Sequence, residues 1–303
     1  MPNTSLERRE LLKGLAAASG VVLASQTIET AHAAPGAKPM SNPAQLFVKD
    51  WGSGKPLLFV HSWAVTNEIW QYQHAHFCDA GYRVVAYDRR GHGRSAQPGD
   101  GYDADTLADD LARVIAERDL FGVTLIGHSM ASGEIVRYLS RHGSSRVARI
   151  VLVAPTTPFL LKTADNLQGI DGAAFERLRD IWRQNFPKWM ADNARPFFLP
   201  DTPQAMLDWG NSLMFQTPLK VAIDCNKAMV ATDFRPDCRA VTAPTLIVHG
   251  ARDASAPVAL TGERTAALIP HAKFVLYDDA PHGLMLTHKD RLHADIEAVI
   301  AGT

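Results

Sequence analysis

The sequence of 303 residues has few cysteines, no excess of charge of either sign and no long apolar run. Cysteine occurs three times, at Cys78, Cys225 and Cys238, which excludes a disulfide framework. None of the three lies in a pattern typical of a thiol nucleophile or a zinc site. We expect buried thiols that pack as small apolar side chains, with a disulfide between Cys225 and Cys238 as the alternative.

Charge and composition exclude several classes of protein. The formal net charge is −1, so nothing in the charge balance points to binding of nucleic acid or of an anionic membrane surface. Hydrophobic residues make up 46% and charged residues 21%, which is typical of one globular domain with a large core. The apolar run Gly14–Ala24 is shorter than the span of about 20 residues that crosses a bilayer. We therefore expect no integral membrane span after removal of the leader.

The N-terminal segment has the organisation of an export signal. A charged stretch, Arg8–Lys13, precedes the apolar run Gly14–Ala24, and small residues follow at Ala31–Ala33. The arginine pair with Leu-Leu-Lys behind it resembles a twin-arginine (Tat) leader. We predict a signal peptide over residues 1–33, a flexible linker over residues 34–45 and a periplasmic or secreted mature protein. A short amphipathic helix or a membrane anchor is the alternative for this segment.

Behind the linker, short apolar or β-branched runs alternate with longer helical patterns. Such runs suit strands that are buried on both faces of a parallel sheet, and their alternation with helices predicts a doubly wound α/β sheet. The expected strands are Leu46–Trp51, Pro56–His61, Arg83–Tyr87, Val123–Gly127, Ile150–Val153, Thr245–His249 and Lys273–Tyr277. The expected helices are Ile69–Ala80, Asp105–Arg118, Met130–His142, Val258–Ile269 and Lys289–Ala301.

One stretch, residues 156–238, interrupts this alternation. It contains no clear strand, is rich in aromatic residues and is divided by several prolines into short helical segments. An insertion of this kind predicts a helical cap over the carboxyl edge of the sheet, where ligands bind. The core then comprises residues 46–155 and 239–303. Most of the aromatic side chains should pack beneath the cap, and we expect Trp182 and Phe198 to line the substrate pocket.

The segment Gly127–Ala131, with the sequence Gly-His-Ser-Met-Ala, predicts a nucleophile. It follows the apolar run Val123–Ile126 and opens a helix. On a sharp strand-to-helix turn a serine hydroxyl is exposed at the sheet edge, and small residues two positions away on each side avoid backbone clashes. A serine that only caps an ordinary helix is the alternative, but the preceding strand argues against it. We predict that Ser129 is the nucleophile.

A serine nucleophile needs a histidine base and a carboxylate that orients the base. In a sheet of this type the three residues follow in the order serine, acid, histidine, each after a strand. His282 lies directly after the last expected strand and is the predicted base. Asp253 follows the penultimate strand and is the predicted acid, with Asp279 as the alternative.

Other histidines have weaker claims to chemistry. The side chain of His128 should diverge from the neighbouring Ser129. His61 and His249 end strands near the expected site and are interpreted as structural hydrogen-bonding residues. His74 and His76 are spaced as metal ligands could be, but they stand on a helix without a third ligand. The sequence therefore predicts no metal site.

The negative oxygen of the tetrahedral intermediate needs backbone N–H donors. The N–H of Met130, directly after the nucleophile, is one candidate, and the second should come from the loop after an earlier strand. Trp63 follows the strand Pro56–His61, so its N–H is the predicted second donor. The ring of Trp63 and the neighbouring Ala64 are also expected at the pocket.

Three further segments, together with the serine turn, resemble a known family. They are Asp88–Ser95 (Asp-Arg-Arg-Gly-His-Gly-Arg-Ser), Thr232–Asp237 (Thr-Asp-Phe-Arg-Pro-Asp) and Asp279–Gly283 (Asp-Ala-Pro-His-Gly). From about Leu46 to Ile300 the chain resembles the bacterial aryl esterases and cofactor-free (non-haem) haloperoxidases. The resemblance implies the α/β-hydrolase fold, with a mostly parallel sheet and a cap inserted before the penultimate strand. It also implies hydrolysis of small aryl and alkyl esters without metal or cofactor, and a side activity in which hydrogen peroxide resolves the acyl-enzyme to a peracid.

The chain departs from this family at two positions of the second donor loop. Ser62 stands where the family has glycine after the histidine, and Ala64 stands where the better perhydrolysing members have proline. Without that proline the backbone is less restricted, so we expect the protein to be mainly an esterase. The export leader is also outside the usual pattern of the family.

Several functions stay open at this point. The alternatives are a haloperoxidase or perhydrolase, a lactonase, and a ligand-binding protein without catalysis, although a complete set of Ser129, Asp253 and His282 argues against the last. Relatives that use an aspartate nucleophile are excluded by Ser129. The expected partner is a small-molecule ester. The acyl and alcohol groups of the substrate and the oligomeric state are left open, a homo-oligomer among the alternatives.

Overall fold

A computed structural model describes residues 43–302. The predicted signal peptide over residues 1–33 lies outside the described residues. Of the predicted linker over residues 34–45, the part up to residue 42 also lies outside them. Between residues 43 and 302, no helix is both long enough and apolar enough to cross a membrane.

The described chain is built on one seven-stranded sheet with the strand order β1-β3-β2-β4-β5-β6-β7. Strand β1 pairs antiparallel with β3, and every other pair is parallel. The predicted mostly parallel sheet is therefore confirmed, with strand ends that differ from the predicted ones by three residues at most. The strands are β1 Val48–Trp51, β2 Pro56–Val60, β3 Arg83–Tyr87, β4 Val123–His128, β5 Val147–Val153, β6 Thr245–Gly250 and β7 Lys273–Tyr277.

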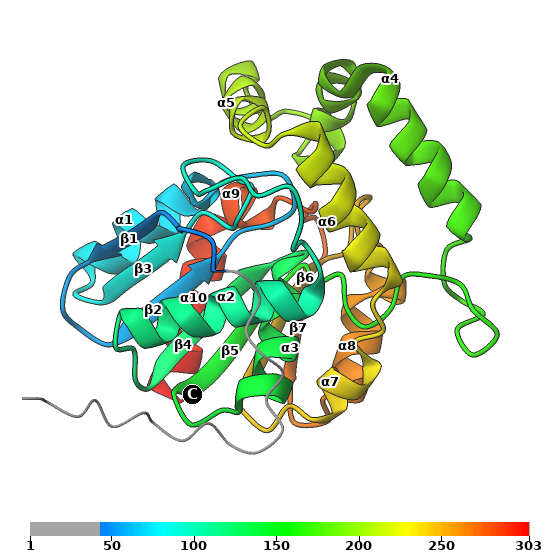
Figure 1. Ribbon diagram of the computed structural model, residues 1–303. Coiled ribbons are helices and arrows are strands. Elements are labelled where there is room, and N and C mark those ends of the chain that lie inside the picture. The colour runs from blue at the N-terminus through cyan, green and yellow to red at the C-terminus, as the bar shows by residue number, and fades with distance from the viewer. Residues whose placement is uncertain (1–42, 303) are drawn as a thin grey trace, which may run out of the picture. The chain divides into compact units, whose positions relative to one another are not determined.

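Helices connect the strands and cover both faces of the sheet (Figure 1). The α-helices are α1 Gln71–Asp79, α2 Ala104–Glu117, α3 Ala131–His142, α4 Gly172–Phe197, α5 Gln204–Met214, α6 Leu219–Ala231, α7 Arg235–Arg239, α8 Gly262–Leu268, α9 Leu284–Thr287 and α10 Lys289–Ala301. Two short 3-10 helices, η1 Asn67–Trp70 and η2 Val258–Leu260, precede α1 and α8. The expected helices Ile69–Ala80 and Val258–Ile269 are thus each divided into a 3-10 turn and an α-helix.

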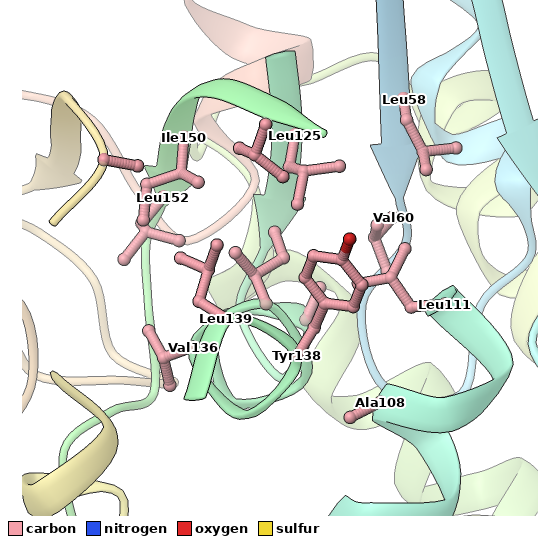
Figure 2. Close-up of a cluster of buried hydrophobic side chains, with 14 of the residues drawn as sticks. Leu58, Val60, Ala108, Leu111, Leu125, Val136, Tyr138, Leu139, Ile150 and Leu152 are labelled. Carbon is pink, nitrogen blue, oxygen red and sulfur yellow. The ribbon is translucent and has the colours of Figure 1, made fainter. Parts of the chain in front are cut away.

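The core lies in two layers, because successive side chains of a buried strand point to opposite faces of the sheet. In β2, Leu58 and Val60 face helices α2 and α3, whereas Leu57 and Phe59 face α1 and α10. Figure 2 shows the first layer, where side chains of α2 and α3 fill the space between these helices and strands β2, β4 and β5. Burial on both faces explains why these strands are almost entirely apolar.

The region between β5 and β6 forms the predicted cap, with helices α4, α5 and α6 beyond the carboxyl ends of the strands (Figure 1). Helix α4 is kinked at Asn185, whose φ of −160° and ψ of 82° are not helical. Proline at position 187 removes a backbone donor and crowds the preceding turn, which accounts for the break. The Asn185 side chain accepts the N–H of Lys188 at 3.0 Å and so caps the second half of the helix.

The three cysteines are free thiols. Cys225 on α6 and Cys238 on α7 are buried, and burial raises the pKa of each to about 12. Both therefore stay protonated at neutral pH and pack as apolar side chains, while the disulfide between them is not formed.

Candidate active site

Ser129 lies on the sharp turn between β4 and α3. Its φ is +58°, in the left-handed region that residues other than glycine seldom adopt. The turn is crowded, since a Cβ at Gly127 would lie 2.5 Å from the Ile135 side chain and 3.1 Å from Cβ of Ala131. Small residues are therefore required on both sides of Ser129, and alanine fits at position 131. The strained turn places the serine hydroxyl at the carboxyl edge of the sheet.

Three side chains from separate loops meet in one hydrogen-bonded chain. Nε2 of His282 lies 2.9 Å from Oγ of Ser129, and Nδ1 of His282 lies 2.6 Å from Oδ2 of Asp253. Ser129 precedes α3, Asp253 follows β6, and His282 lies between β7 and α9. All three residues are buried. The structure thus brings together the predicted nucleophile, acid and base.

The second oxygen of Asp253 is bound by the backbone. Oδ1 accepts the N–H of Ser255 at 2.9 Å and that of Ala256 at 2.7 Å. Burial alone would raise the pKa of Asp253, but His282, His249 and the Ala256 N–H together lower it below its ordinary value. The ionised carboxylate accepts the Nδ1 proton of His282, which leaves a lone pair on Nε2 facing Ser129.

His249 is the second imidazole at this carboxylate. Its Nε2 lies 3.1 Å from Oδ2 of Asp253 and 2.9 Å from the carbonyl oxygen of Ala256. It therefore supports the loop that carries the acid, in line with the structural role expected from its position after a strand. Asp279, the alternative acid, lies 3.1 Å from Nε2 of His288, and its side chain is 65% exposed. Asp253, not Asp279, is the carboxylate in contact with His282.

His128 has a place that the sequence did not reveal. Its Nε2 lies 3.0 Å from the carbonyl oxygen of His282, and the two rings are 4.6 Å apart. Burial lowers the pKa of His128 well below its ordinary value, so the neutral ring donates one N–H to that carbonyl. From the cap, the carbonyl of Phe197 accepts the N–H of Gly283 at 2.9 Å. The loop of His282 is thus held both by His128, next to Ser129 on the strand-to-helix turn, and by Phe197 of the cap.

The two predicted backbone donors are available. Within residues 43–302, no protein acceptor is bound by the N–H of Trp63 or by that of Met130. Met130 directly follows Ser129, and Trp63 and Ser129 line one cavity, which is described below. Left-handed φ angles occur at Ala64 and Ser129 but not at Ser62, so serine in place of the family's glycine needs no unusual backbone there.

A cavity of about 490 Å³ lies between the cap and the core and reaches Ser129 and His282. Trp63, Trp182 and Phe198 line it, as predicted. Ala64 does not line it. With a φ of +55° its side chain turns away into a buried cluster that includes Trp182, Phe186 and Met190.

Charged side chains are absent from the described lining of the cavity, which is made mainly of aromatic and aliphatic groups. Apart from the imidazole of His282, the polar side chains on its wall are mainly hydroxyls and amides, including those of Thr156, Asn211 and Asn226. In the described part of the chain, no three histidine, cysteine or acidic side chains gather as metal ligands would. His76 is instead stacked on His293, with ring centroids 4.0 Å apart.

Residues 57–295 match the sequence model of the Alpha/beta hydrolase family. The chain belongs to this family. The alpha/beta hydrolase is 37% identical to the non-heme chloroperoxidase CPO-A1 of Kitasatospora aureofaciens over 82% of its own length and 92% of that protein. It is 33% identical to the bifunctional esterase/perhydrolase DCH of Acinetobacter calcoaceticus, over 84% of its own length and 95% of that protein.

Solved structures resemble this alpha/beta hydrolase over the same region. A bromoperoxidase from Bacillus anthracis has a TM-score of 0.82 and 32% identity, and covers 86% of this chain and 96% of its own. An esterase from Exiguobacterium antarcticum has a TM-score of 0.82 and 27% identity, and covers 85% of this chain and 96% of its own. The predicted resemblance to bacterial esterases and cofactor-free haloperoxidases is therefore confirmed.

Proposed function

We propose that this alpha/beta hydrolase cleaves small, neutral carboxylic esters through an acyl-enzyme on Ser129. The observation that carries the proposal is the unbroken chain from Ser129 through His282 to Asp253 at the wall of an apolar cavity. A ligand-binding protein would not need a base that is oriented by a buried carboxylate.

Acylation begins when Oγ of Ser129 attacks the ester carbonyl carbon and passes its proton to Nε2 of His282. The negative charge that forms on the carbonyl oxygen is bound by the N–H groups of Trp63 and Met130. Asp253 stabilises the imidazolium of His282. The imidazolium then protonates the leaving alkoxide as the carbon–oxygen bond breaks, and the acyl group stays on Ser129.

Deacylation repeats these steps with water in place of serine. His282 takes a proton from the water as its oxygen attacks the acyl carbon, and the same two N–H groups bind the new oxyanion. Collapse of the intermediate breaks the bond to Oγ, which regains its proton from His282. The products are a carboxylic acid and the free enzyme.

The uncharged wall of the cavity predicts a preference for neutral acyl groups. Burying an unpaired carboxylate costs several kcal/mol, so kcat/KM for p-nitrophenyl pentanoate should exceed that for p-nitrophenyl hydrogen glutarate by at least about 10²-fold. Masking the carboxylate as its methyl ester should restore most of the rate, which separates charge from length. Equal rates for the acid and its methyl ester would contradict a cavity without a cation. Neutral lactones in the same panel test the lactonase alternative.

Perhydrolysis is the second candidate function, because one relative is named a bifunctional esterase/perhydrolase and others are named haloperoxidases. Both reactions share the acyl-enzyme and differ in whether water or hydrogen peroxide resolves it. The shape of the loop at Trp63 and Ala64 should therefore influence the ratio of the two reactions.

We predict that Ala64→Pro raises the ratio of peracid formation to ester cleavage. Proline is restricted to a φ of about −65°, whereas Ala64 has a φ of +55°. The substitution must therefore move the peptide between Trp63 and Ala64, not merely stiffen it. Ala64→Gly is the matched control, since glycine adopts positive φ freely and should leave the ratio unchanged. A native protein that already forms peracid as well as the proline variant would make perhydrolysis the main function.

We also propose that the protein is exported. The support is the order of the arginine pair, the apolar run and the small residues within residues 1–33. The mass of the mature protein, purified from the periplasm or the medium, would give the cleavage position; an intact N-terminus in the cytoplasm would contradict export.

A further inference from the structure

A buried arginine binds the backbone of the loop that carries the Trp63 N–H. Arg89 follows β3 and is fully buried. Its Nη2 donates to the carbonyl oxygen of His61 at 2.6 Å, and its Nη1 donates to that of Ser62 at 3.1 Å. One guanidinium thus binds two successive carbonyls of the loop.

His61 adds a third bond to the same loop. The backbone N–H of Arg89 donates to Nε2 of His61 at 2.8 Å, so Nε2 carries no proton. Burial, followed by the charge of Arg89, lowers the pKa of His61 well below its ordinary value, which keeps the ring neutral. The remaining proton lies on Nδ1, which donates to the carbonyl oxygen of Ser62 at 2.8 Å. That carbonyl oxygen therefore has two donors.

The orientation of this carbonyl sets the direction of the Trp63 N–H. The carbonyl of Ser62 and the N–H of Trp63 belong to the same peptide plane, and in a trans peptide they point in opposite directions. Because the carbonyl is bound to Arg89 and His61, the N–H is directed away from them.

Arg89 is also bound to the helix that begins behind the nucleophile. Its Nε donates to Oε1 of Glu134 at 2.7 Å, and its Nη2 lies 2.5 Å from the same oxygen. The two side chains are 1% and 2% exposed. Glu134 lies in the first turn of α3, which directly follows Met130. A single arginine therefore connects the loop of one oxyanion donor to the helix of the other.

We propose that Arg89, together with Glu134 and His61, is a positioning residue that fixes the separation of the Trp63 and Met130 N–H groups around the oxyanion. The inference rests on the proposed ester hydrolysis. A buried ion pair gives little net stability compared with apolar residues of the same shape, so stability alone does not account for this pair. Its three bonds to the loop give it a specific geometric task.

The test is Arg89→Lys, compared with Arg90→Lys. Lysine has a single nitrogen and cannot reproduce the planar fork in which Nε, Nη1 and Nη2 bind Glu134 and two carbonyls, so kcat should fall by about 10²-fold while KM changes by less than about threefold. Arg90 is the matched control, because it is also buried and is bound to Asp110 of α2, with Nη2 2.9 Å from Oδ1. Its replacement should lower stability without a selective loss of kcat.

A second readout separates positioning from damage to the fold. Oγ of Ser129 adds to the carbonyl carbon of an aryl trifluoromethyl ketone, and the adduct carries a tetrahedral oxyanion. The corresponding secondary alcohol only occupies the cavity. In Arg89→Lys the inhibition constant of the ketone should rise by about the same factor as kcat falls, and that of the alcohol should not change. Glu134→Gln keeps an acceptor for Arg89, so this variant should fold. Its kcat should fall by about tenfold, and the inhibition constant of the ketone should rise by about tenfold.

The outcomes distinguish this inference from the proposed function. If the wild type hydrolyses esters and binds the ketone, but Arg89→Lys and Glu134→Gln change neither quantity by more than about threefold, the positioning role is wrong. A loss of alcohol binding equal to that of ketone binding would also overturn it, since it indicates a distorted cavity. A wild type that neither cleaves esters nor binds the ketone would overturn the proposed function itself.

Discussion

Replacing Ser129 with alanine should lower ester hydrolysis by about 10⁴- to 10⁶-fold, because Nε2 of His282 then has no nucleophile to activate. The fold should survive, since alanine already adopts left-handed φ in this protein, at Ala64 with +55° and at Ala154 with +45°. The substitution removes one oxygen and leaves the strained turn as it is. The measurement is kcat for a p-nitrophenyl ester, together with the circular dichroism spectrum of the variant.

Ser140 provides the matched control. It lies on the same helix α3, where its hydroxyl donates to Asp237 at 2.6 Å, so Ser140→Ala removes a serine hydroxyl outside the site. Activity should stay near that of the wild type. Diethyl p-nitrophenyl phosphate should phosphorylate the wild type and the control once each, and the Ser129 variant not at all. Labelling of another serine, or more than a trace of activity in folded Ser129→Ala, would contradict the assignment of the nucleophile.

Asp253→Asn should lower kcat by about 10⁴-fold through a change in the tautomer of His282. The N–H groups of Ser255 and Ala256 bind Oδ1 of the acid, so they should hold the oxygen of the new amide in that place. The amide NH₂ then faces Nδ1 of His282, and the imidazole proton moves to Nε2. In that form the histidine cannot accept the proton of Ser129.

Asp279→Asn is the control for this prediction, because Asp279 contacts His288 at the surface and not His282. Its activity should equal that of the wild type. Loss of activity in Asp279→Asn, with Asp253→Asn unaffected, would show that the acid is wrongly assigned. Comparable thermal unfolding of both variants would exclude an effect through stability alone.

The parts of the site that follow single strands could be predicted from the sequence. Ser129, Asp253 and His282 each lie directly behind a strand, and buried parallel strands are short apolar runs that are visible locally. The chain order of the three residues then leaves few choices among the other histidines and acids. The sequence favours Asp253 over Asp279 because Asp253 follows the penultimate strand, and the folded positions agree, since Oδ2 of Asp253 lies 2.6 Å from Nδ1 of His282 whereas Asp279 contacts His288.

Residues that act across the fold could not be predicted. Arg89 and Glu134 are 45 positions apart, and nothing local in either segment indicates that they form a buried pair beneath the donor loop. The contact of His128 with the carbonyl of His282 spans 154 positions. Ala64 was expected in the pocket because it follows Trp63, but its left-handed backbone turns the side chain into the cap cluster. A backbone reversal of that kind has no signal in an alanine.

The sequence by itself determined the α/β sheet, the strand-to-helix turn at Ser129 and the identity of its two partners, because strand periodicity and turn chemistry act over a few neighbouring residues. The tertiary structure decided the shape and charge of the cavity and the network of Arg89 around the loop that carries the Trp63 N–H. These features depend on which side chains meet after the cap packs on the core. Such contacts join segments that are distant in the chain, and their energies are set by burial and geometry that exist only in the folded protein.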